Sequence, residues 1–431
     1  MTYVRVFLAA VLGLASFAHA DNWRKQANDR IEKIRKGDFV VHLVDEAGKP
    51  LTGVKVDIRQ TRHHFLFGTC FNGDPDKKDA EEQRYLKFVT DHFNLITPEW
   101  QVKWDVIEPE PGKYTWEVSD KLIQWAQQNN IAVRGHTLFW PKPHRIPQWN
   151  KQFVDTPEKQ AQLRKHMEDF LTATLTRYKG KFFCWDVCNE MLDGPFYSSL
   201  YGPDIHLWMY KRAKELDPNA VLFTNEYALI GPANGNYAAP KLERYVQLLK
   251  TLIAKGAPIG GVGVQDHGLQ RFNTDDDDDL DDLDDPSTRP AANRRLRRGG
   301  DVRPSDVIRT LDRLGELNLP IHLTELSSIT PDEKVRADTL EMIYRVGFAH
   351  PKVESIVIWG FWSKRHFKAM EGRGSWIALL DDDFNMTEAG KRVFGLLEDE
   401  WKTKVQAQPD EAGKCSFRGF YGTYELSITD A

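Results

Sequence analysis

Short apolar runs alternate with longer amphipathic segments through most of the chain, between residues 64 and 401. The apolar runs have the length of strands that are buried on both faces, and the longer segments repeat with the period of a helix. The predicted strands are 65–71, 93–98, 131–139, 182–189, 220–226, 261–266, 320–325 and 355–360. The predicted helices include 79–91, 118–129, 157–178, 242–254, 305–317 and 332–350. Eight strand–helix units of this size predict an α/β fold, the (β/α)8 TIM barrel.

The segments on either side of the predicted barrel have the period-two alternation of half-buried strands. Residues 39–44 and 54–58 predict a hairpin within an N-terminal region, 21–62, and residues 414–418 and 423–428 predict another within 404–431. A lone hairpin is only marginally stable in water. We therefore expect the two hairpins to meet in one small β-subdomain beside a barrel formed by residues 63–403.

The first twenty residues have the pattern of an export signal. Arg5 supplies a positive charge, Val6 to Phe17 is a short apolar run, and Ala18-His19-Ala20 fits the cleavage rule. A membrane anchor is the alternative, but the apolar run is short for a membrane span and ends at a cleavage-like site. We therefore assign 1–20 as a signal peptide and expect a secreted or periplasmic protein.

Composition and charge exclude several classes of protein. A chain of 431 residues with 41% hydrophobic and 28% charged content can bury a large core and is not a disordered protein. Its net charge of −5 gives no reason to expect nucleic acid or an anionic membrane as a partner. The four cysteines, Cys70, Cys184, Cys188 and Cys415, form neither a zinc pattern nor a catalytic Cys/His signature, and Cys184 and Cys188 are best interpreted as small core residues.

One segment, 273–303, interrupts the strand–helix pattern. It begins with a run of aspartates, 275–285, and ends with an arginine-rich stretch, 294–303. Blocks of like charge favour a solvated insertion after the sixth strand. A calcium loop is the alternative, but the spacing of an EF-hand, with its central Gly and terminal Glu, is missing.

Polar and aromatic residues follow the predicted strands where each strand ends. They lie in Thr97–Trp104, Arg134–Trp140, Asn189-Glu190, Asn225-Glu226-Tyr227, Gln265-Asp266-His267, Glu325 and Trp359-Gly360. The carboxyl ends of barrel strands form the active-site face of this fold. Glu190 and Glu325 would therefore meet there, and two carboxyl groups at one site are what glycoside hydrolysis requires. The 13 tryptophans add aromatic faces of the kind that stack on sugar rings, although more than half of them are expected in the core.

In this order of motifs the chain resembles glycoside hydrolase family 10, the family of endo-β-1,4-xylanases. The resemblance runs from about residue 65 to 401 and is most specific in Trp185-Asp186-Val187-Cys188-Asn189-Glu190, Arg134-Gly135-His136-Thr137 and Leu323-Thr324-Glu325. The stretch 139–149 and Asn225-Glu226-Tyr227 are closer to the plant-like branch than to the commonest bacterial xylanases. The resemblance implies a retaining hydrolase that cleaves internal β-1,4 bonds of xylan. We expect a monomer that needs no cofactor and no metal.

Roles for individual residues follow from the resemblance. It implies that Glu190 is the general acid/base and Glu325 the nucleophile, while Asn189 binds the 2-hydroxyl of the sugar at the cleavage point. The other residues that it assigns to substrate binding or support are Glu99, Lys103, His136, Trp140, Tyr227, Gln265, His267 and Trp359. Plainer alternatives exist, because buried histidines are often satisfied by backbone, lysines are usually exposed, and large tryptophans pack cores.

Three positions depart from the family pattern. Trp100 stands where the family usually has Asn, Ser327 where it usually has the Asp that partners a histidine, and Phe367 where a second Trp is usual. These departures put the substrate in question. The alternatives are a retaining hydrolase of another β-linked or decorated polysaccharide, a weakly active sugar-binding barrel, and a secreted calcium-binding structural protein built around the aspartate run.

Overall fold

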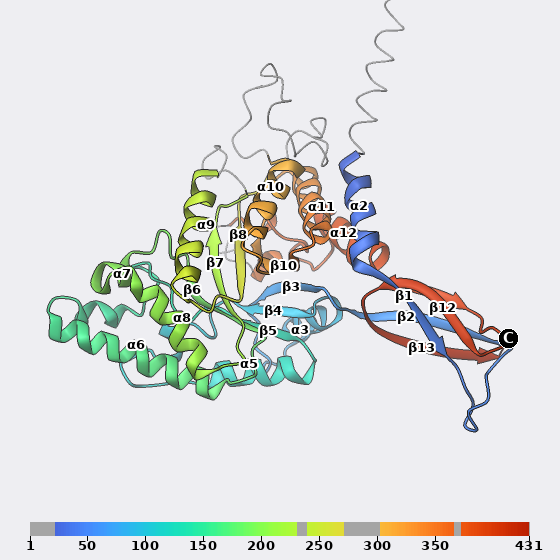
Figure 1. Cartoon of the computed structure of the whole chain (residues 1–431), viewed down its shortest axis with the longest axis horizontal. Helices are drawn as coiled ribbons and strands as arrows, with labels where there is room; N and C mark the ends of the chain where they lie inside the picture. The colour runs from blue at the N-terminus through green and yellow to red at the C-terminus, as the bar shows by residue number, and fades with distance from the viewer. Residues whose placement is uncertain (1–21, 231–238, 271–301, 366–371, 431) are drawn as a thin grey trace, which may run out of the picture.

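The computed structural model describes residues 22–230, 239–270, 302–365 and 372–430. Eight parallel strands close into a barrel in the order β10-β3-β4-β5-β6-β7-β8-β9, with helices packed around it (Figure 1). The predicted (β/α)8 barrel is thereby confirmed. The export signal, the charged insertion up to residue 301, the calcium alternative and Phe367 all lie outside the described residues.

The barrel strands are β3 Leu66–Phe71, β4 Leu95–Pro98, β5 Ala132–Gly135, β6 Cys184–Asn189, β7 Leu222–Tyr227, β8 Gly261–Asp266, β9 Ile321–Leu326 and β10 Val353–Ile358. The helices are α2 Asn22–Arg35, α3 Ala80–His92, α4 Trp104–Ile107, α5 Glu117–Gln128, α6 Pro157–Arg177, α7 Phe196–Tyr201, α8 Asp204–Leu216, α9 Ala239–Ala254, α10 Pro304–Gly315, α11 Glu333–Ala349 and α12 Glu388–Gly395, with a short 3-10 helix, η1, at Gln148–Phe153. Each predicted strand is present. The third is shorter than expected because residues beyond Gly135 leave the ladder, although Leu138 and Phe139 still donate to β6 carbonyls at 3.0 Å.

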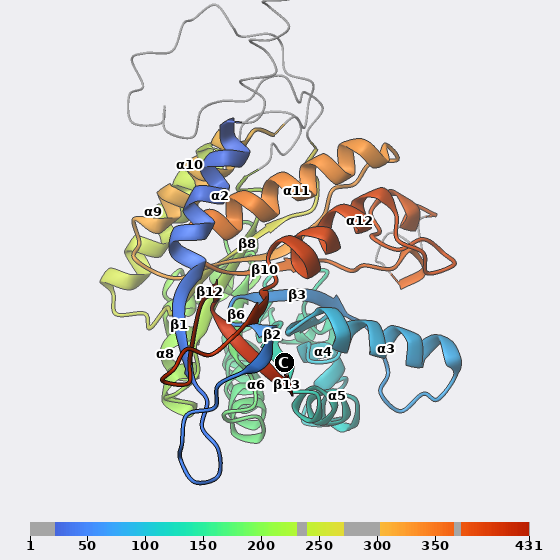
Figure 2. The same cartoon turned by 90° about the vertical axis from the view of Figure 1, so that its right-hand side faces the viewer.

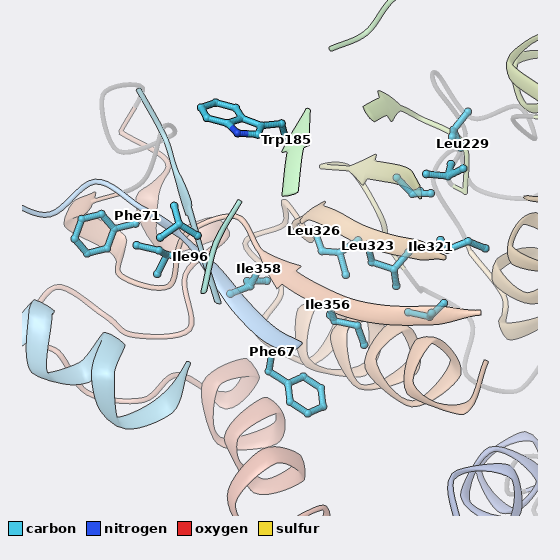
Figure 3. Packing of buried hydrophobic residues seen from close by; sticks show 14 of the residues in the cluster. Phe67, Phe71, Ile96, Trp185, Leu229, Ile321, Leu323, Leu326, Ile356 and Ile358 are labelled. Carbon is cyan, nitrogen blue, oxygen red and sulfur yellow. The ribbon is translucent and has the colours of Figure 1, made fainter. Parts of the chain in front are cut away.

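Local sequence explains where the main helices begin. Thr156 caps α6 by accepting from the amide of Lys159, and Pro157 occupies the first turn, where no amide partner is needed. Asp79 and Asp332 cap α3 and α11 in the same way. The helices pack their apolar faces onto the strands, whose residues are almost all buried. Figure 3 shows the resulting core, in which Phe67, Ile96, Leu323 and Ile356 fill the layers around the barrel.

The two ends of the chain form a small β-subdomain that extends to one side of the barrel (Figure 1). It contains β1 Lys36–His42, β2 Val54–His63, β11 Lys404–Ala407, β12 Lys414–Phe420 and β13 Gly422–Asp430. The predicted subdomain is therefore present, but the predicted hairpins are wrong. Strand β1 pairs with β12, and β2 pairs with β11 and β13, so every ladder joins one end of the chain to the other. Alternation identifies a half-buried strand but not its partner.

Residues 22–35, which lie in the region predicted as a β-hairpin, form helix α2. Its buried residues are Trp23, Ala27 and Ile31, spaced four apart on one helical face. The helix lies against α11 (Figure 2). At its end the Arg35 guanidinium donates to the carbonyls of Phe348, His350 and Val353 at 2.7–2.8 Å, which fixes α2 to the barrel. None of the helices in the described ranges is long and apolar enough to span a membrane.

Candidate active site

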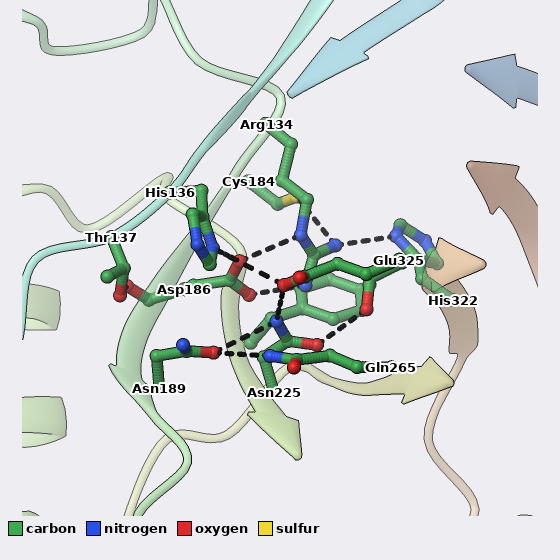
Figure 4. Close-up of polar contacts among 12 residues, drawn as sticks. Arg134, His136, Thr137, Cys184, Asp186, Asn189, Asn225, Gln265, His322 and Glu325 are labelled. Atoms are coloured by element: carbon green, nitrogen blue, oxygen red, sulfur yellow. Dashed lines mark hydrogen bonds and ion pairs between the residues drawn. The ribbon is translucent and has the colours of Figure 1, made fainter. Parts of the chain in front are cut away.

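Neighbouring strands deliver the candidate side chains to one end of the barrel. Strands β6, β7, β8 and β9 are adjacent and parallel, so Asn189, Asn225, Gln265 and Glu325 end up side by side at their carboxyl ends. Figure 4 shows these four residues linked by hydrogen bonds. The structure therefore brings together the strand-end residues that the sequence places far apart.

Asn225 is hydrogen-bonded to both glutamates. Its side-chain amide donates to Glu325 Oε1 at 2.8 Å and to Asn189 Oδ1 at 3.0 Å, and its backbone carbonyl accepts from the Glu190 amide at 2.8 Å. Thr324 Oγ1 donates to Asn225 Oδ1 at 2.6 Å, which fixes the orientation of that amide. The sequence prediction did not include Asn225, although it stands in the polar strand end 225–227 that signalled the site.

Glu325 is held as a carboxylate. His267 Nε2 lies 3.1 Å from Glu325 Oε2, and His136 Nδ1 lies 3.9 Å from Oε1. Burial raises the pKa of the Glu325 carboxyl, but the hydrogen bond from His267 and the charges of His136 and His267 outweigh burial, so this pKa lies below its ordinary value. A buried, ionised carboxylate is the form in which a carboxyl group acts as a nucleophile.

Glu190 follows β6 with a left-handed backbone, at φ 53°, a conformation that is uncommon for a residue other than glycine. The residue is only 7% exposed, and Oε2 forms an ion pair with Lys142 Nζ. The Lys142 ammonium also lies 4.3 Å from the ring centroid of Tyr227. Nothing in the sequence signalled Lys142, because a lysine in a loop is usually solvated.

Asn189 has an amide oriented by its neighbours. Its Oδ1 accepts from Gln265 Nε2 at 2.8 Å and from Asn225. Its Nδ2 is buried and has no hydrogen-bond partner among the described residues. A buried donor without a partner is costly. This nitrogen is therefore suited to donate to a hydroxyl of a bound sugar.

A buried ion pair supports His136 from within the barrel. Arg134 binds both carboxylate oxygens of Asp186, with its Nε 3.0 Å from Oδ2, and Asp186 Oδ2 lies 3.0 Å from His136 Nδ1 (Figure 4). Burial raises the pKa of Asp186. The charge of Arg134 and the hydrogen bond from His136 lower it by more than burial raises it, so this pKa lies below its ordinary value. The remaining Arg134 nitrogen, Nη1, lies 2.9 Å from His322 Nδ1. Arg134 and Asp186 were missed as supporting residues, although two opposite charges inside apolar strands were visible in the sequence.

Glu99, Lys103 and Trp140 lie on another side of the site. Asn72 donates to Glu99 Oε2 at 3.1 Å, and Lys103 Nζ lies 4.9 Å from the ring centroid of Trp140. Burial lowers the pKa of Lys103 despite the opposing charge of Glu325. The Trp140 ring is 6.0 Å from that of His136, which connects this group to the two glutamates. The Trp140 Nε1 is buried without a partner in the described part of the chain.

Trp359 packs beside both histidines of the site. Its ring centroid lies 5.6 Å from that of His136 and 6.0 Å from that of His267, and the residue is 7% exposed. The second ring nitrogen of His267, Nδ1, lies 3.3 Å from Ser327 Oγ. The serine therefore supplies a neutral contact at the position where the family pattern has a carboxylate.

Tyr227 and its neighbours form the flank of the site behind Lys142. The Tyr227 hydroxyl donates to Asp193 Oδ2 at 2.8 Å, and Lys241 Nζ lies 2.9 Å from the same carboxylate and 3.1 Å from Glu226 Oε1. Burial raises the pKa of Glu226, which is fully buried. Across the described residues, no group of three or more His, Cys, Asp or Glu side chains has an arrangement that could hold a metal ion.

This barrel, with two glutamates at its carboxyl end and a ring of aromatic and polar side chains around them, has the architecture of a glycoside hydrolase. The model of glycosyl hydrolase family 10 matches residues 58–282. The chain belongs to this family.

Two sequence relatives and one solved structure illustrate the similarity. The chain is 36% identical over 407 residues to the anti-sigma-I factor RsgI6 of Acetivibrio thermocellus, and the match covers 94% of this chain and 47% of that protein. It is 33% identical over 404 residues to endo-1,4-beta-xylanase 1 of Arabidopsis thaliana, with 94% and 38% covered. The structure of xylanase 10B from Thermotoga petrophila RKU-1 in complex with xylobiose matches with a TM-score of 0.62 and 25% identity, covering 78% of this chain and 95% of that one. The chain thus spans less than half the length of these two sequence relatives. Xylanase relatives from a plant at 33% identity agree with the plant-like similarity of the motifs.

Proposed function

We propose that this chain is an endo-acting β-1,4-xylanase that works by double displacement with retention of configuration. The observation that carries the proposal is the link through Asn225, which binds Glu325 by its side chain and Glu190 by its backbone. A retaining enzyme needs its two carboxyl groups only ~5–5.5 Å apart, and an inverting enzyme needs a wider gap for water. One residue in contact with both glutamates supports the shorter separation.

The two glutamates take different roles in this mechanism. Glu325, whose pKa is lowered by its histidine neighbours despite burial, attacks the anomeric carbon and forms a glycosyl-enzyme. Glu190 first donates a proton to the departing oxygen and then removes a proton from the water that hydrolyses the intermediate. The Asn189 Nδ2, buried without a protein partner in the described ranges, donates to the sugar 2-hydroxyl.

Xylan is the proposed substrate because several relatives bear the name endo-1,4-beta-xylanase. Glu99, Lys103, His136 and Trp140 would bind hydroxyls on the non-reducing side, and Trp359 would lie under the sugar at the cleavage point. Gln265, His267 and Tyr227 would hold the catalytic groups in place. We also propose export of the protein, with cleavage after residue 20, and a monomeric state. The first is tested by N-terminal sequencing of the exported protein and the second by light scattering.

The test of mechanism separates the roles of the two glutamates. Glu325→Ala should abolish turnover and should not form an adduct with a 2-deoxy-2-fluoro glycoside. Glu190→Ala should lose most activity on xylan but keep far more on an aryl glycoside, whose leaving group needs little protonation, and added azide should yield a product of retained configuration. Glu117→Ala, at an exposed position of α5, is the matched control and should behave as the wild type. Inverted products from the wild type, followed by NMR, would rule out the retaining mechanism.

A second candidate function is a sugar-binding barrel with little hydrolysis. The observation that favours it is the contact of Lys142 Nζ with Glu190 Oε2, because the ammonium occupies an oxygen from which the acid would donate its proton. Release of reducing sugars from xylan separates the two candidates, since a binding protein would retain affinity for xylan without releasing any.

A further inference from the structure

The loop that follows β5 places basic side chains around the entrance to the site. Residues 141–146 include Lys142, His144 and Arg145, of which His144 and Arg145 are exposed. Lys142 contacts Glu190, and the Arg145 guanidinium lies 4.6 Å from the ring centroid of Trp140. The same ring has Lys103 at 4.9 Å. The positive charges therefore surround residues that the proposed reaction assigns to the substrate.

Of the carboxylates nearby, Glu190 pairs with Lys142, but none pairs with Arg145 within the described ranges. Glu325 is bound by Asn225 and His267, and Glu99 by Asn72. Within the described ranges, Arg145 has no carboxylate at ion-pair distance, and its guanidinium lies over the Trp140 ring. The loop therefore carries a guanidinium that is free to bind an anion, in a protein whose net charge is −5.

The proposed mechanism also leaves Lys142 without its counter-ion. Glu190 must carry a proton when it acts as the acid. A protonated Glu190 no longer neutralises the Lys142 ammonium, whose side chain is only 17% exposed. A partly buried cation that loses its partner is destabilised. A carboxylate on the bound substrate would restore the pairing at the stage at which bond cleavage begins.

We propose that Lys142 and Arg145 form a subsite for the carboxylate of a uronosyl side group on xylan. This inference rests on the proposed function, since it requires xylan in the site. Arginine suits the role because its planar guanidinium binds a carboxylate through two parallel hydrogen bonds. Lysine adds a point charge beside the acid. Neutral xylan offers no group that would use either cation, so the subsite makes the enzyme prefer an acidic substrate.

The test compares two polymers that differ in one group. Glucuronoxylan and the same polymer with its carboxyl groups reduced to alcohols have the same backbone and carry side groups at the same positions. For the wild type at low salt, we expect kcat/KM to be about tenfold higher on the acidic polymer, in line with one charge-assisted hydrogen bond. The ratio should fall as ionic strength rises, because exposed charges are screened.

Variants locate the effect. Arg145→Gln should bring the ratio of the two kcat/KM values close to one, and Lys142→Gln should lower the ratio as well as the activity on both polymers. The matched control is Arg59→Gln, which removes an exposed guanidinium from β2 in the β-subdomain and should keep the wild-type ratio. Taking the ratio within each variant cancels any general loss of activity.

The two proposals fail in different ways. A wild type that cleaves both polymers equally well, or a ratio that survives Arg145→Gln, would overturn the carboxylate subsite while leaving the xylanase function intact. If the wild type cleaves neither polymer, the xylanase function is wrong. The subsite is then judged by calorimetric Kd values for the two polymers. A tenfold ratio that Arg145→Gln abolishes supports the subsite, and equal Kd values refute it.

Discussion

Replacing Asn225 by aspartate would put a second carboxylate against the nucleophile. Asn225 Nδ2 lies 2.8 Å from Glu325 Oε1, so Asn225→Asp changes a donor into an acceptor with almost no change of shape. At an effective dielectric constant near 20, two unit charges at this distance repel by about 6 kcal/mol, which corresponds to about 4 pKa units. The pair would therefore hold one proton at neutral pH, as two adjacent carboxyl groups do in aspartic proteases.

The expected result is a large loss of activity with a shifted pH profile. Because Glu325 must be ionised to attack, kcat/KM for an aryl xylobioside at pH 6 should fall at least ~100-fold, and the acidic limb of the profile should move up by more than ~1 unit. Asn225→Ala removes the donor without adding charge, so we expect a smaller loss of about 10–100-fold. The aryl substrate isolates the nucleophile because its leaving group needs little protonation.

Stability gives an independent readout. The pair in the folded variant binds its proton more tightly than the unfolded chain does, so the folded state is favoured at low pH and loses this advantage as pH rises. Relative to the wild type, Asn225→Asp should therefore become less stable between about pH 4 and pH 8 in urea titrations. Gln162→Glu, at an exposed position of α6, is the control for a generic added charge. An unchanged acidic limb in a folded Asn225→Asp protein would refute the proposed contact between Asn225 and the nucleophile.

Further predictions concern stability and product length. Glu341 forms an ion pair with Arg24 and lies near other cations. These contacts outweigh the effect of burial and lower the pKa of Glu341 to about 2. Glu341→Gln should cost about 3 kcal/mol at pH 7, and in urea titrations this difference should shrink as pH falls from 4.5 toward 2, where the wild type loses the contribution. Gly135→Ala should destabilise the barrel by about 3 kcal/mol or more in the same assay, because the new Cβ would lie 2.1 Å from the Trp185 ring. A cost under about 1 kcal/mol would show that the ring can move. Trp100 is 43% exposed and should either stack on a sugar or block a subsite. Trp100→Asn should therefore change the lengths of the oligosaccharides released from xylan. Identical chromatograms for the variant and the wild type would place Trp100 away from the substrate.

The barrel was predictable because its strands are buried on both faces. Such strands appear as continuous apolar runs, and in a closed barrel the chain order also determines which strands are neighbours. The polar ends of these runs then indicate the active-site face. Residues such as Glu190 and Glu325 could therefore be proposed without a structure, because their position at a strand end carries the information.

Contacts made by loops and by the chain ends could not be predicted in the same way. Lys142 lies in a loop, and no periodicity says that its ammonium folds back onto Glu190. The partners of β1 and β2 lie at the other end of the chain; Arg59 in β2 pairs with Glu425, 366 residues away in sequence. Helix α2 was missed because β-alternation in the residues that follow it dominated the interpretation, although Trp23, Ala27 and Ile31 have helical spacing.

The cross-pairing of the two chain ends has a consequence for how the protein reaches its folded state. Strands β1 and β2 are synthesised early, but their ladders require β11, β12 and β13, which are synthesised last. Contacts between distant parts of a chain form slowly, because a long loop must close first. During synthesis, residues 36–63 therefore leave the ribosome long before any partner strand exists, with unpaired edges that are prone to aggregation. Chaperones that bind extended segments would be needed most in this interval.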